Sequence, residues 1–148
     1  MKTVLFVCDG NTCRSPMAAG ILRAMLKEKN ITDVKVLSYG LYAEVGDTMN
    51  IKAKSIMRKL GIRVGGFRSK QITENDIFKV YAVITMTQAQ KKLLPYYNVI
   101  SAYDLIGQDI PDPYGKSENY YEQTASVLKI LCEKIIKEIE DDENCSSK

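Results

Sequence analysis

A cysteine and an arginine stand near the start of the chain with five residues between them, Cys8 and Arg14. The segment before them, residues 4–7, has the apolar character of a buried strand, and the segment after them has helical spacing. The pair therefore occupies a short loop between an expected strand and an expected helix. Gly10 and Asn11 are residue types that adopt left-handed backbone angles readily, so this loop can turn tightly. The pattern predicts an anion-binding loop that holds a nucleophile.

The loop is expected to run directly into the first turn of a helix. Backbone N–H groups there point into one concavity, and the helix dipole adds roughly half a positive charge. The planar guanidinium of Arg14 can grip two oxygens at once, which suits phosphate. The same field stabilises a thiolate, so Cys8 is expected to be the nucleophile although the chain contains no histidine. Attack by Cys8 on phosphorus predicts a phosphocysteine intermediate, and Ser15 is a candidate hydrogen-bond donor to the departing thiolate.

Two-step hydrolysis also requires a group that protonates the leaving group and then activates water. Because histidine is absent, a carboxyl group is the natural candidate. Asp112 lies between Pro111 and Pro113, which restrict its backbone and can hold its side chain over a site from a stiff loop. Asp109 is a weaker rival because no proline follows it. The sequence therefore predicts Cys8 and Asp112 as a catalytic pair.

Segment 8–16 reads Cys-Asp-Gly-Asn-Thr-Cys-Arg-Ser-Pro. It resembles the signature of the low-molecular-weight protein-tyrosine phosphatases, Cys-x-Gly-Asn-x-Cys-Arg-Ser-Pro, and the resemblance covers nearly the whole chain. It implies a four-stranded parallel sheet with flanking helices, and hydrolysis of phosphomonoesters without metal or other cofactor. It further implies that Cys8 is the nucleophile, Arg14 the phosphate clamp, Asn11 the residue that shapes the loop, and Ser15 the partner of the thiolate.

The same resemblance assigns supporting roles. Residues of the loop that are expected to support phosphate binding are Asp9, Gly10, Asn11, Thr12, Cys13 and Ser15. The general acid of the family lies in an Asp-Pro-Tyr motif that matches residues 112–114, so Tyr114 is expected to form one wall of the cleft. Tyr42, after the second strand, is expected to form the opposite wall. The chain departs from the family at Tyr39, where alanine is common, and at residues 67–68, near which a histidine is usual.

Thr12 separates two substrate hypotheses. Tyrosine phosphatases of this family usually carry a branched apolar residue at that position, whereas the branch that removes phosphate from arginine carries threonine. Residues 86–87 and the run 112–124 also resemble the arginine branch. Phosphoarginine is therefore slightly preferred, and the alternative is a tyrosine phosphatase in which threonine is a tolerated substitution of equal size. Either way the expected partner is a phosphorylated protein, and inorganic phosphate is the product.

The four cysteines lack the density and spacing of a secreted disulfide framework, so reduced thiols are expected. Cys13 can form a reversible disulfide with Cys8 that would protect the nucleophile from irreversible oxidation. A small buried thiol facing the core is an equally good interpretation of Cys13. Cys132, at helical spacing among apolar residues, is expected in the core, and Cys145 in the tail.

Two rival functions share this loop chemistry. Arsenate reductases can use the same anion loop, but they need further cysteines to relay a disulfide, and none lies between Cys13 and Cys132. An inactive phosphate-binding module would keep the loop and lack the acid. The presence of both Arg14 and Asp112 argues against that module.

The elements that must position these residues follow from the hydrophobic pattern. Strands are expected at residues 2–7, 34–38, 81–86 and 98–101. Helices are expected at residues 17–29, 51–60, after Thr73, after Thr87 and at 117–140. Ser15 is expected to be the N-cap of the first helix, with Pro16 in its first turn, and residues 104–116 are expected to form a loop.

Alternating strands and helices predict an α/β fold with three α-β-α layers and a four-stranded parallel sheet, flavodoxin-like and doubly wound. Ligands bind such sheets at the carboxyl ends of the strands, where Cys8 is expected. A single phosphatase domain is predicted over residues 1–140, followed by a frayed, acidic and polar tail at 141–148.

Composition excludes further classes of partner. The net charge of +3 is small and dispersed, which argues against a nucleic-acid partner. No apolar run approaches membrane-spanning length, and the first residues are unlike a signal peptide. A monomer that acts in the cytoplasm, with no membrane partner and no metal site, is therefore predicted.

Overall fold

The computed structural model describes residues 1–146, and the side chains of residues 1–144. Strands and helices alternate along most of the chain, as the hydrophobic pattern predicts. The elements are β1 (Lys2–Cys8), α1 (Arg14–Glu28), β2 (Val34–Gly40), α2 (Ile51–Lys59), α3 (Glu74–Phe78), β3 (Ala82–Thr85), α4 (Gln88–Lys92), β4 (Val99–Ser101), α5 (Ala102–Ile106) and α6 (Glu118–Ser146).

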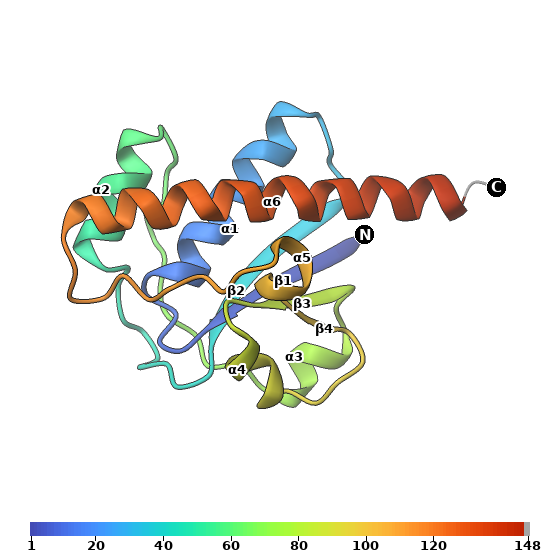
Figure 1. The fold of residues 1–148 in the computed structure, drawn as a ribbon, viewed down its shortest axis with the longest axis horizontal. Coiled ribbons are helices and arrows are strands. Elements are labelled where there is room, and N and C mark those ends of the chain that lie inside the picture. Colours follow the sequence, from blue (N-terminus) through green and yellow to red (C-terminus); the bar gives the residue numbers. More distant parts are fainter. Residues whose placement is uncertain (147–148) are drawn as a thin grey trace.

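The four strands form one parallel sheet in the order β2-β1-β3-β4. Strand β1 is central, and its residues Val4–Val7 are fully buried because helices cover both faces of the sheet (Figure 1). The chain passes from β1 to β2 on one side and returns to β3 on the other side of β1. The carboxyl end of β1 is thus the switch point of the sheet, where ligands of doubly wound folds bind.

Each face of the sheet has its own hydrophobic core. Alternate residues of β1 point to opposite faces, with Val4 and Phe6 in the larger cluster and Leu5 and Val7 in the smaller one. Helices α1, α2 and α6 pack over the larger cluster, and α3 and α4 lie on the opposite side of the sheet in Figure 1. This arrangement confirms the predicted three-layer α/β fold.

Helix α1 begins earlier than the predicted residue 17. Its first helical residue is Arg14 and its N-cap is Cys13, so the expectation that Ser15 is the N-cap is wrong. Ser15 and Pro16 lie inside the first turn, where the missing N–H of proline removes no helical hydrogen bond. As a result Arg14 is part of the helix and not of the loop before it.

Helix α5 was not predicted, and it occupies the start of the expected loop at 104–116. Ser101 and Asp104 form a capping box, in which the serine hydroxyl accepts from the Asp104 N–H and the aspartate accepts from the Ser101 N–H. Gly107, with a φ of 76°, ends the helix in the left-handed conformation. The Ser-x-x-Asp spacing was the signal that could have found this helix.

Helix α6 continues past the predicted end at residue 140 and reaches Ser146. The predicted helix end at residue 140 is therefore wrong, since residues 141–146 are helical, while residues 147–148 and the side chain of Cys145 lie outside the described part. No glycine or proline interrupts the segment after Glu118. The Tyr81 hydroxyl also donates a hydrogen bond to the Asp142 carboxylate, which ties this last part of the helix to the start of β3.

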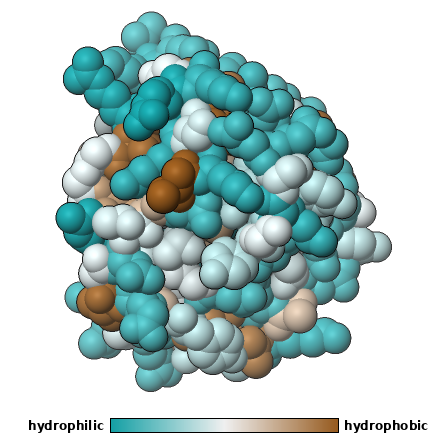
Figure 2. Space-filling model, turned by 90° about the vertical axis from the view of Figure 1, so that its left-hand side faces the viewer, coloured by the Kyte–Doolittle hydropathy of each residue, from teal (hydrophilic) through white to brown (hydrophobic). Residues whose placement is uncertain are grey.

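The end of the molecule toward which β1 runs faces the viewer in Figure 2. Its surface is mostly hydrophilic, with apolar side chains scattered singly or in small groups. Among the helices within residues 1–146, none is both long and apolar enough to cross a membrane.

Candidate active site

The loop after β1, residues 9–13, makes its tightest turn at Asn11. Asn11 has a φ of 57°, in the left-handed region, whereas Gly10 does not, so only one of the two expected left-handed positions is used. A second glycine, Gly40 at the end of β2, is required by close packing. A Cβ there would lie 2.9 Å from the Asp9 carbonyl oxygen and 3.0 Å from the Cβ of Asn11. The end of β2 thus supports the loop from behind.

The Cys8 sulfur lies within this loop and receives hydrogen bonds from two directions. The backbone N–H of Asn11 donates to Sγ at 3.3 Å, and the Ser15 Oγ is 3.0 Å from Sγ. Asn11 Nδ2 donates to the same Ser15 Oγ at 2.8 Å, so the serine oxygen acts as an acceptor. The Cys8 sulfur and the Tyr39 carbonyl oxygen, at 3.4 Å, are the two groups to which the serine hydroxyl can donate. The sulfur is therefore held at a fixed position within the loop.

Asn11 is itself anchored by residues far away in the sequence. Its Nδ2 also donates to Ser38 Oγ at 3.1 Å, and its Oδ1 accepts from the Lys70 N–H at 2.9 Å. The Ser69 hydroxyl donates to the Asn11 carbonyl oxygen at 2.9 Å. All the polar groups of this buried side chain therefore have partners, which holds the strained backbone conformation in place.

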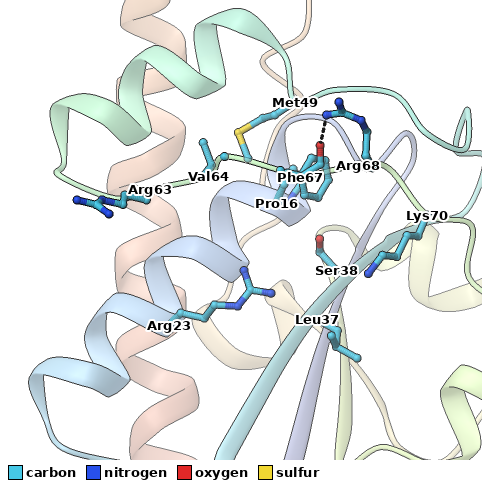
Figure 3. A pocket seen from close by; sticks show the side chains of 12 residues that line it. Pro16, Arg23, Leu37, Ser38, Met49, Arg63, Val64, Phe67, Arg68 and Lys70 are labelled. Carbon is cyan, nitrogen blue, oxygen red and sulfur yellow. Dashed lines mark hydrogen bonds between the residues drawn. The ribbon is translucent and has the colours of Figure 1, made fainter.

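Behind the loop, Ser38 and Lys70 also line a hollow of about 310 Å³ between α1, β2 and residues 63–70 (Figure 3). The hollow is rimmed by basic side chains, among them Arg23, whose guanidinium donates to the Val36 carbonyl oxygen at 2.6 Å. Residues 67–68 form one wall. In this chain Ser69 and Lys70 make the contacts that hold the loop from that side.

Arg14 is almost completely buried and is fixed by three oxygens. Its Nη1 donates to the Ile110 carbonyl oxygen at 2.9 Å, and its Nη2 lies 3.6 Å from a carboxylate oxygen of each of two aspartates, Asp9 and Asp112. Sequence reasoning placed Arg14 and Asp112 at one site, and the structure brings them together. It also brings in Asp9, whose carboxylate was expected only to support the loop.

The segment around Asp112 is tied to the sheet, which sets the position of its carboxylate. The Ile110 N–H donates to the Met86 carbonyl oxygen at 2.8 Å, just after β3, and Pro113 is buried. The Asp112 Oδ1 accepts from the Tyr114 N–H at 3.1 Å, so one oxygen orients the local turn while the other faces Arg14. The rival acid, Asp109, instead accepts from the Gln88 N–H at the start of α4.

Gln90 is a site residue that sequence reasoning missed. It is only 3% exposed, and its Oε1 accepts from the N–H groups of Met86 and Thr87. Its Nε2 donates to the Asp9 Oδ1 at 3.0 Å. The Thr-x-x-Gln capping pattern was visible in the sequence, but the contact with Asp9 joins residues 81 positions apart and depends on the pairing of β1 with β3.

The remaining predicted site residues lie around the loop. Tyr42 and Tyr114 are each 70% exposed, and the Tyr42 N–H donates to the Asp9 carbonyl oxygen, which places its backbone beside the loop. Thr12 is half-buried, and its carbonyl oxygen accepts from the N–H of Asn50, the N-cap of α2. Both aromatic rings are thus largely open to solvent.

Cys13 is buried, and burial raises the pKa of its thiol, an effect that a hydrogen bond with Tyr121 partly offsets. The Tyr121 hydroxyl lies 3.5 Å from the Cys13 sulfur, and burial raises the pKa of this tyrosine as well. Cys8, Cys13 and Cys132 are free thiols. Cys132 is in the core as predicted, where its thiol faces the Ala18 carbonyl oxygen.

Within the part of the chain that the structure describes, no group of three histidine, cysteine, aspartate or glutamate side chains is placed to hold a metal ion.

Residues 3–145 match the family model described as low molecular weight phosphotyrosine protein phosphatase. The chain belongs to this family. It is therefore a protein phosphatase, a hydrolase of phosphomonoesters, as the resemblance of segment 8–16 implied. The family assignment also agrees with the parallel sheet and with the loop at the carboxyl end of β1.

Two relatives within the low-molecular-weight phosphatase family differ in the substrate that their names give. A protein-arginine-phosphatase of Geobacillus stearothermophilus is 30% identical, with 95% of this chain and 97% of the relative covered. The low molecular weight protein-tyrosine-phosphatase PtpA of Staphylococcus saprophyticus is 32% identical, with 97% of each chain covered. The overall identities are too similar to favour either substrate.

Solved structures of the low-molecular-weight phosphatase family have the same fold. The YwlE arginine phosphatase from Geobacillus stearothermophilus superimposes with a TM-score of 0.86 at 29% identity, over 97% of this chain and 96% of that one. A cysteine-to-serine mutant of YwlE, described as carrying a phosphorylated active-site serine, gives a TM-score of 0.88 at 26% identity, over 96% and 98% of the two chains.

Proposed function

We propose that this chain removes phosphate from protein side chains through a covalent phosphocysteine intermediate, with phosphoarginine preferred over phosphotyrosine. The observation that carries the catalytic part is the environment of the Cys8 sulfur, which receives hydrogen bonds from Asn11 and Ser15 inside an anion-binding loop. The Arg14 guanidinium, adjacent to both the loop and Asp112, supplies the phosphate clamp next to an acid.

In the first step, the Cys8 thiolate attacks phosphorus and the bond from phosphorus to the leaving group breaks. Asp112, in its protonated form, donates a proton to the leaving nitrogen or oxygen. The loop N–H groups and Arg14 hold the phosphoryl oxygens while their negative charge is redistributed. The product of this step is the dephosphorylated side chain and a phosphocysteine.

In the second step, the Asp112 carboxylate takes a proton from water, and the water oxygen attacks phosphorus. The bond between sulfur and phosphorus breaks, and inorganic phosphate is released. The Ser15 hydroxyl donates to the departing thiolate, which makes sulfur a better leaving group. Support for a covalent intermediate also comes from the YwlE mutant with a phosphorylated active-site serine.

The preference for phosphoarginine rests on Thr12 in the loop. A hydroxyl in this loop, here 3.9 Å from the Cys13 sulfur, is a polar group that suits a guanidinium, whereas a branched apolar side chain suits a phenyl ring. A relative from Geobacillus stearothermophilus is named as a protein-arginine-phosphatase, so phosphoarginine is a substrate within this family. The site therefore favours a polar leaving group.

Phosphotyrosine is the second candidate, and two observations favour it. The exposed rings of Tyr42 and Tyr114 can stack on an aromatic leaving group. The relative PtpA of Staphylococcus saprophyticus is named as a tyrosine phosphatase. Arsenate reduction has less support, because Cys132 is buried in the core and no cysteine lies between Cys13 and Cys132.

The test compares matched phosphoarginine and phosphotyrosine peptides, with the native protein and with Thr12→Ile. We expect the native protein to have the higher kcat/KM on phosphoarginine, and Thr12→Ile to lower that value by about 10-fold, the effect of one lost polar contact. A native protein much faster on phosphotyrosine, with no change in Thr12→Ile, would reject the arginine preference.

We further propose that the enzyme acts as a monomer in the cytoplasm. The four cysteines lack the density and spacing of a secreted disulfide framework, which supports a reducing compartment. Sedimentation of the purified protein at micromolar concentration is expected to give the mass of one chain.

A further inference from the structure

Asp9 puts a negative charge into a loop whose task is to bind a dianion. It follows the nucleophile directly, and its side chain is 55% exposed. A carboxylate at this place repels both the Cys8 thiolate and an incoming phosphoryl group. An uncharged side chain would support the loop without this repulsion. The presence of the carboxylate therefore indicates a second role.

The Asp9 carboxylate is held in place by a buried side chain. Gln90 donates to its Oδ1, and the other end of the Gln90 amide is fixed by the N–H groups of Met86 and Thr87. The second oxygen, Oδ2, faces Arg14 at 3.6 Å. The aspartate thus cannot swing freely away from the phosphoryl site, and its charge acts at a defined position beside Arg14.

Asp9 lines a cleft of about 480 Å³ that adjoins the phosphoryl site. Its charged side chains are Asp9, Asp109 and Asp112, balanced only by Arg14. The cleft therefore has an excess of negative charge, and Ala89 and Leu93 supply an apolar part of the wall. A cleft with carboxylates and a short apolar surface fits the aliphatic stem and cationic head of an arginine side chain.

Substrate binding changes the charge balance around Asp9. Without substrate, the Arg14 guanidinium neutralises part of the negative charge of Asp9 and Asp112. When a phosphoryl group binds to Arg14, it competes with these two carboxylates for the same cation. A tyrosine leaves as a neutral phenol and supplies no positive charge next to Asp9. An arginine leaves as a guanidinium cation, so positive charge is available next to Asp9 as the bond to phosphorus breaks.

We propose that Asp9 is a specificity-determining residue, whose carboxylate binds the guanidinium of a phosphoarginine substrate and disfavours phosphotyrosine. This inference rests on the proposed phosphatase function and gives its substrate preference a second determinant, independent of Thr12.

The experiment uses Asp9→Asn in the full chain, with the same pair of phosphopeptides. Asparagine has the same shape and keeps an oxygen to accept from Gln90, so only the charge is removed. We expect kcat/KM on phosphoarginine to fall by about 10-fold or more and kcat/KM on phosphotyrosine to stay constant or rise. Higher salt should reduce the difference, because the interaction is between charges at an open cleft.

Asp33→Asn is the matched control, since it removes one exposed carboxylate at a residue that does not line the cleft, and it should change either rate less than twofold. Equal losses on both substrates in Asp9→Asn would overturn the inference, because they would mean that Asp9 only positions Arg14. Unchanged rates would also overturn it. If the native enzyme fails to hydrolyse phosphoarginine at all, the proposed function itself is wrong, and the native rates alone reveal that outcome.

Discussion

Ser15 lies inside the first turn of α1 with its hydroxyl 3.0 Å from the Cys8 sulfur. A serine just before a proline and an apolar helical run is typical of an N-cap, and that expectation is wrong here. The helix starts at Arg14, so the hydroxyl does not cap it and instead lies beside the Cys8 sulfur, with the Tyr39 carbonyl oxygen at 3.4 Å as a second partner. At the scale of single residues, then, the type of side chain was informative, and its partner had to be read from the structure.

The first prediction at this scale concerns Cys8. Cys8→Ser should lower turnover by at least about 1,000-fold, because a serine hydroxyl in this loop is a far weaker nucleophile than a thiolate. Phosphate affinity, measured by calorimetry, should remain within a few-fold because the loop N–H groups and Arg14 are unchanged.

Cys132→Ala provides the control for Cys8→Ser, since Cys132 is a core thiol and its loss should leave turnover per folded molecule intact. Substantial turnover in Cys8→Ser would refute the covalent route.

At the scale of elements, α5 shows how a short helix is stabilised by its cap. The Asp104 carboxylate accepts from Lys91 Nζ at 2.6 Å and from the Ser101 N–H at 2.9 Å. The hydrogen bond from Lys91 is the main reason that the pKa of Asp104 is lowered, with the backbone bond to Ser101 next. The helix begins where β4 ends and contacts α6, so its position also depends on the sheet.

Asp104→Ala should lower the free energy of unfolding by about 1 kcal/mol at pH 7, a modest value because the side chain is partly exposed. A carboxyl group whose pKa is lower in the folded state stabilises the fold above its unfolded pKa, and this contribution disappears as the pH falls through the folded pKa. The difference between native and variant should therefore shrink in acid, as urea unfolding at several pH values would show.

Asp33→Ala is the control for the cap, because the Asp33 side chain has no described hydrogen bond or ion pair within residues 1–144. It should change stability little at any pH. If the effect of Asp104→Ala stayed constant down to pH values well below the carboxyl range, the ionised form would not be the source of the stabilisation.

At the scale of the whole molecule, α6 covers the larger core and contacts α1, α2 and α5. Its buried face carries Leu128, with no exposed surface, while Ile130 on the other side is 51% exposed. Leu128→Ala should destabilise the protein by about 2–5 kcal/mol, because it removes buried apolar surface and leaves a cavity. Thermal unfolding followed by circular dichroism would measure the loss.

Ile130→Ala removes a similar amount of side chain from the exposed face of the same helix, and its effect should stay within about 0.5 kcal/mol. Equal destabilisation by the two variants would mean that helix propensity rather than core packing sets the contribution of α6. The comparison thus separates what the helix contributes locally from what it contributes by covering the sheet.

The sequence by itself determined the chemistry of the loop at residues 8–16, the alternation of strands and helices, and the α/β class, because these depend on neighbours in the chain and on hydrophobic spacing. The predicted start of α1 and the predicted end of α6 were wrong, and α5 was not predicted. Cap and breaker signals compete locally, and contacts from distant residues decide between them.

Only the tertiary structure decided which distant groups complete the site. Ser38 and Lys70 hold Asn11, Gln90 holds Asp9, and the Ile110 carbonyl oxygen holds Arg14. Each of these contacts spans a large separation in sequence and exists because parallel strands bring their carboxyl ends to one edge of the sheet. The order and register in which strands pair cannot be predicted from a pattern along the chain. The residues that surround the nucleophile are therefore known only from the folded structure.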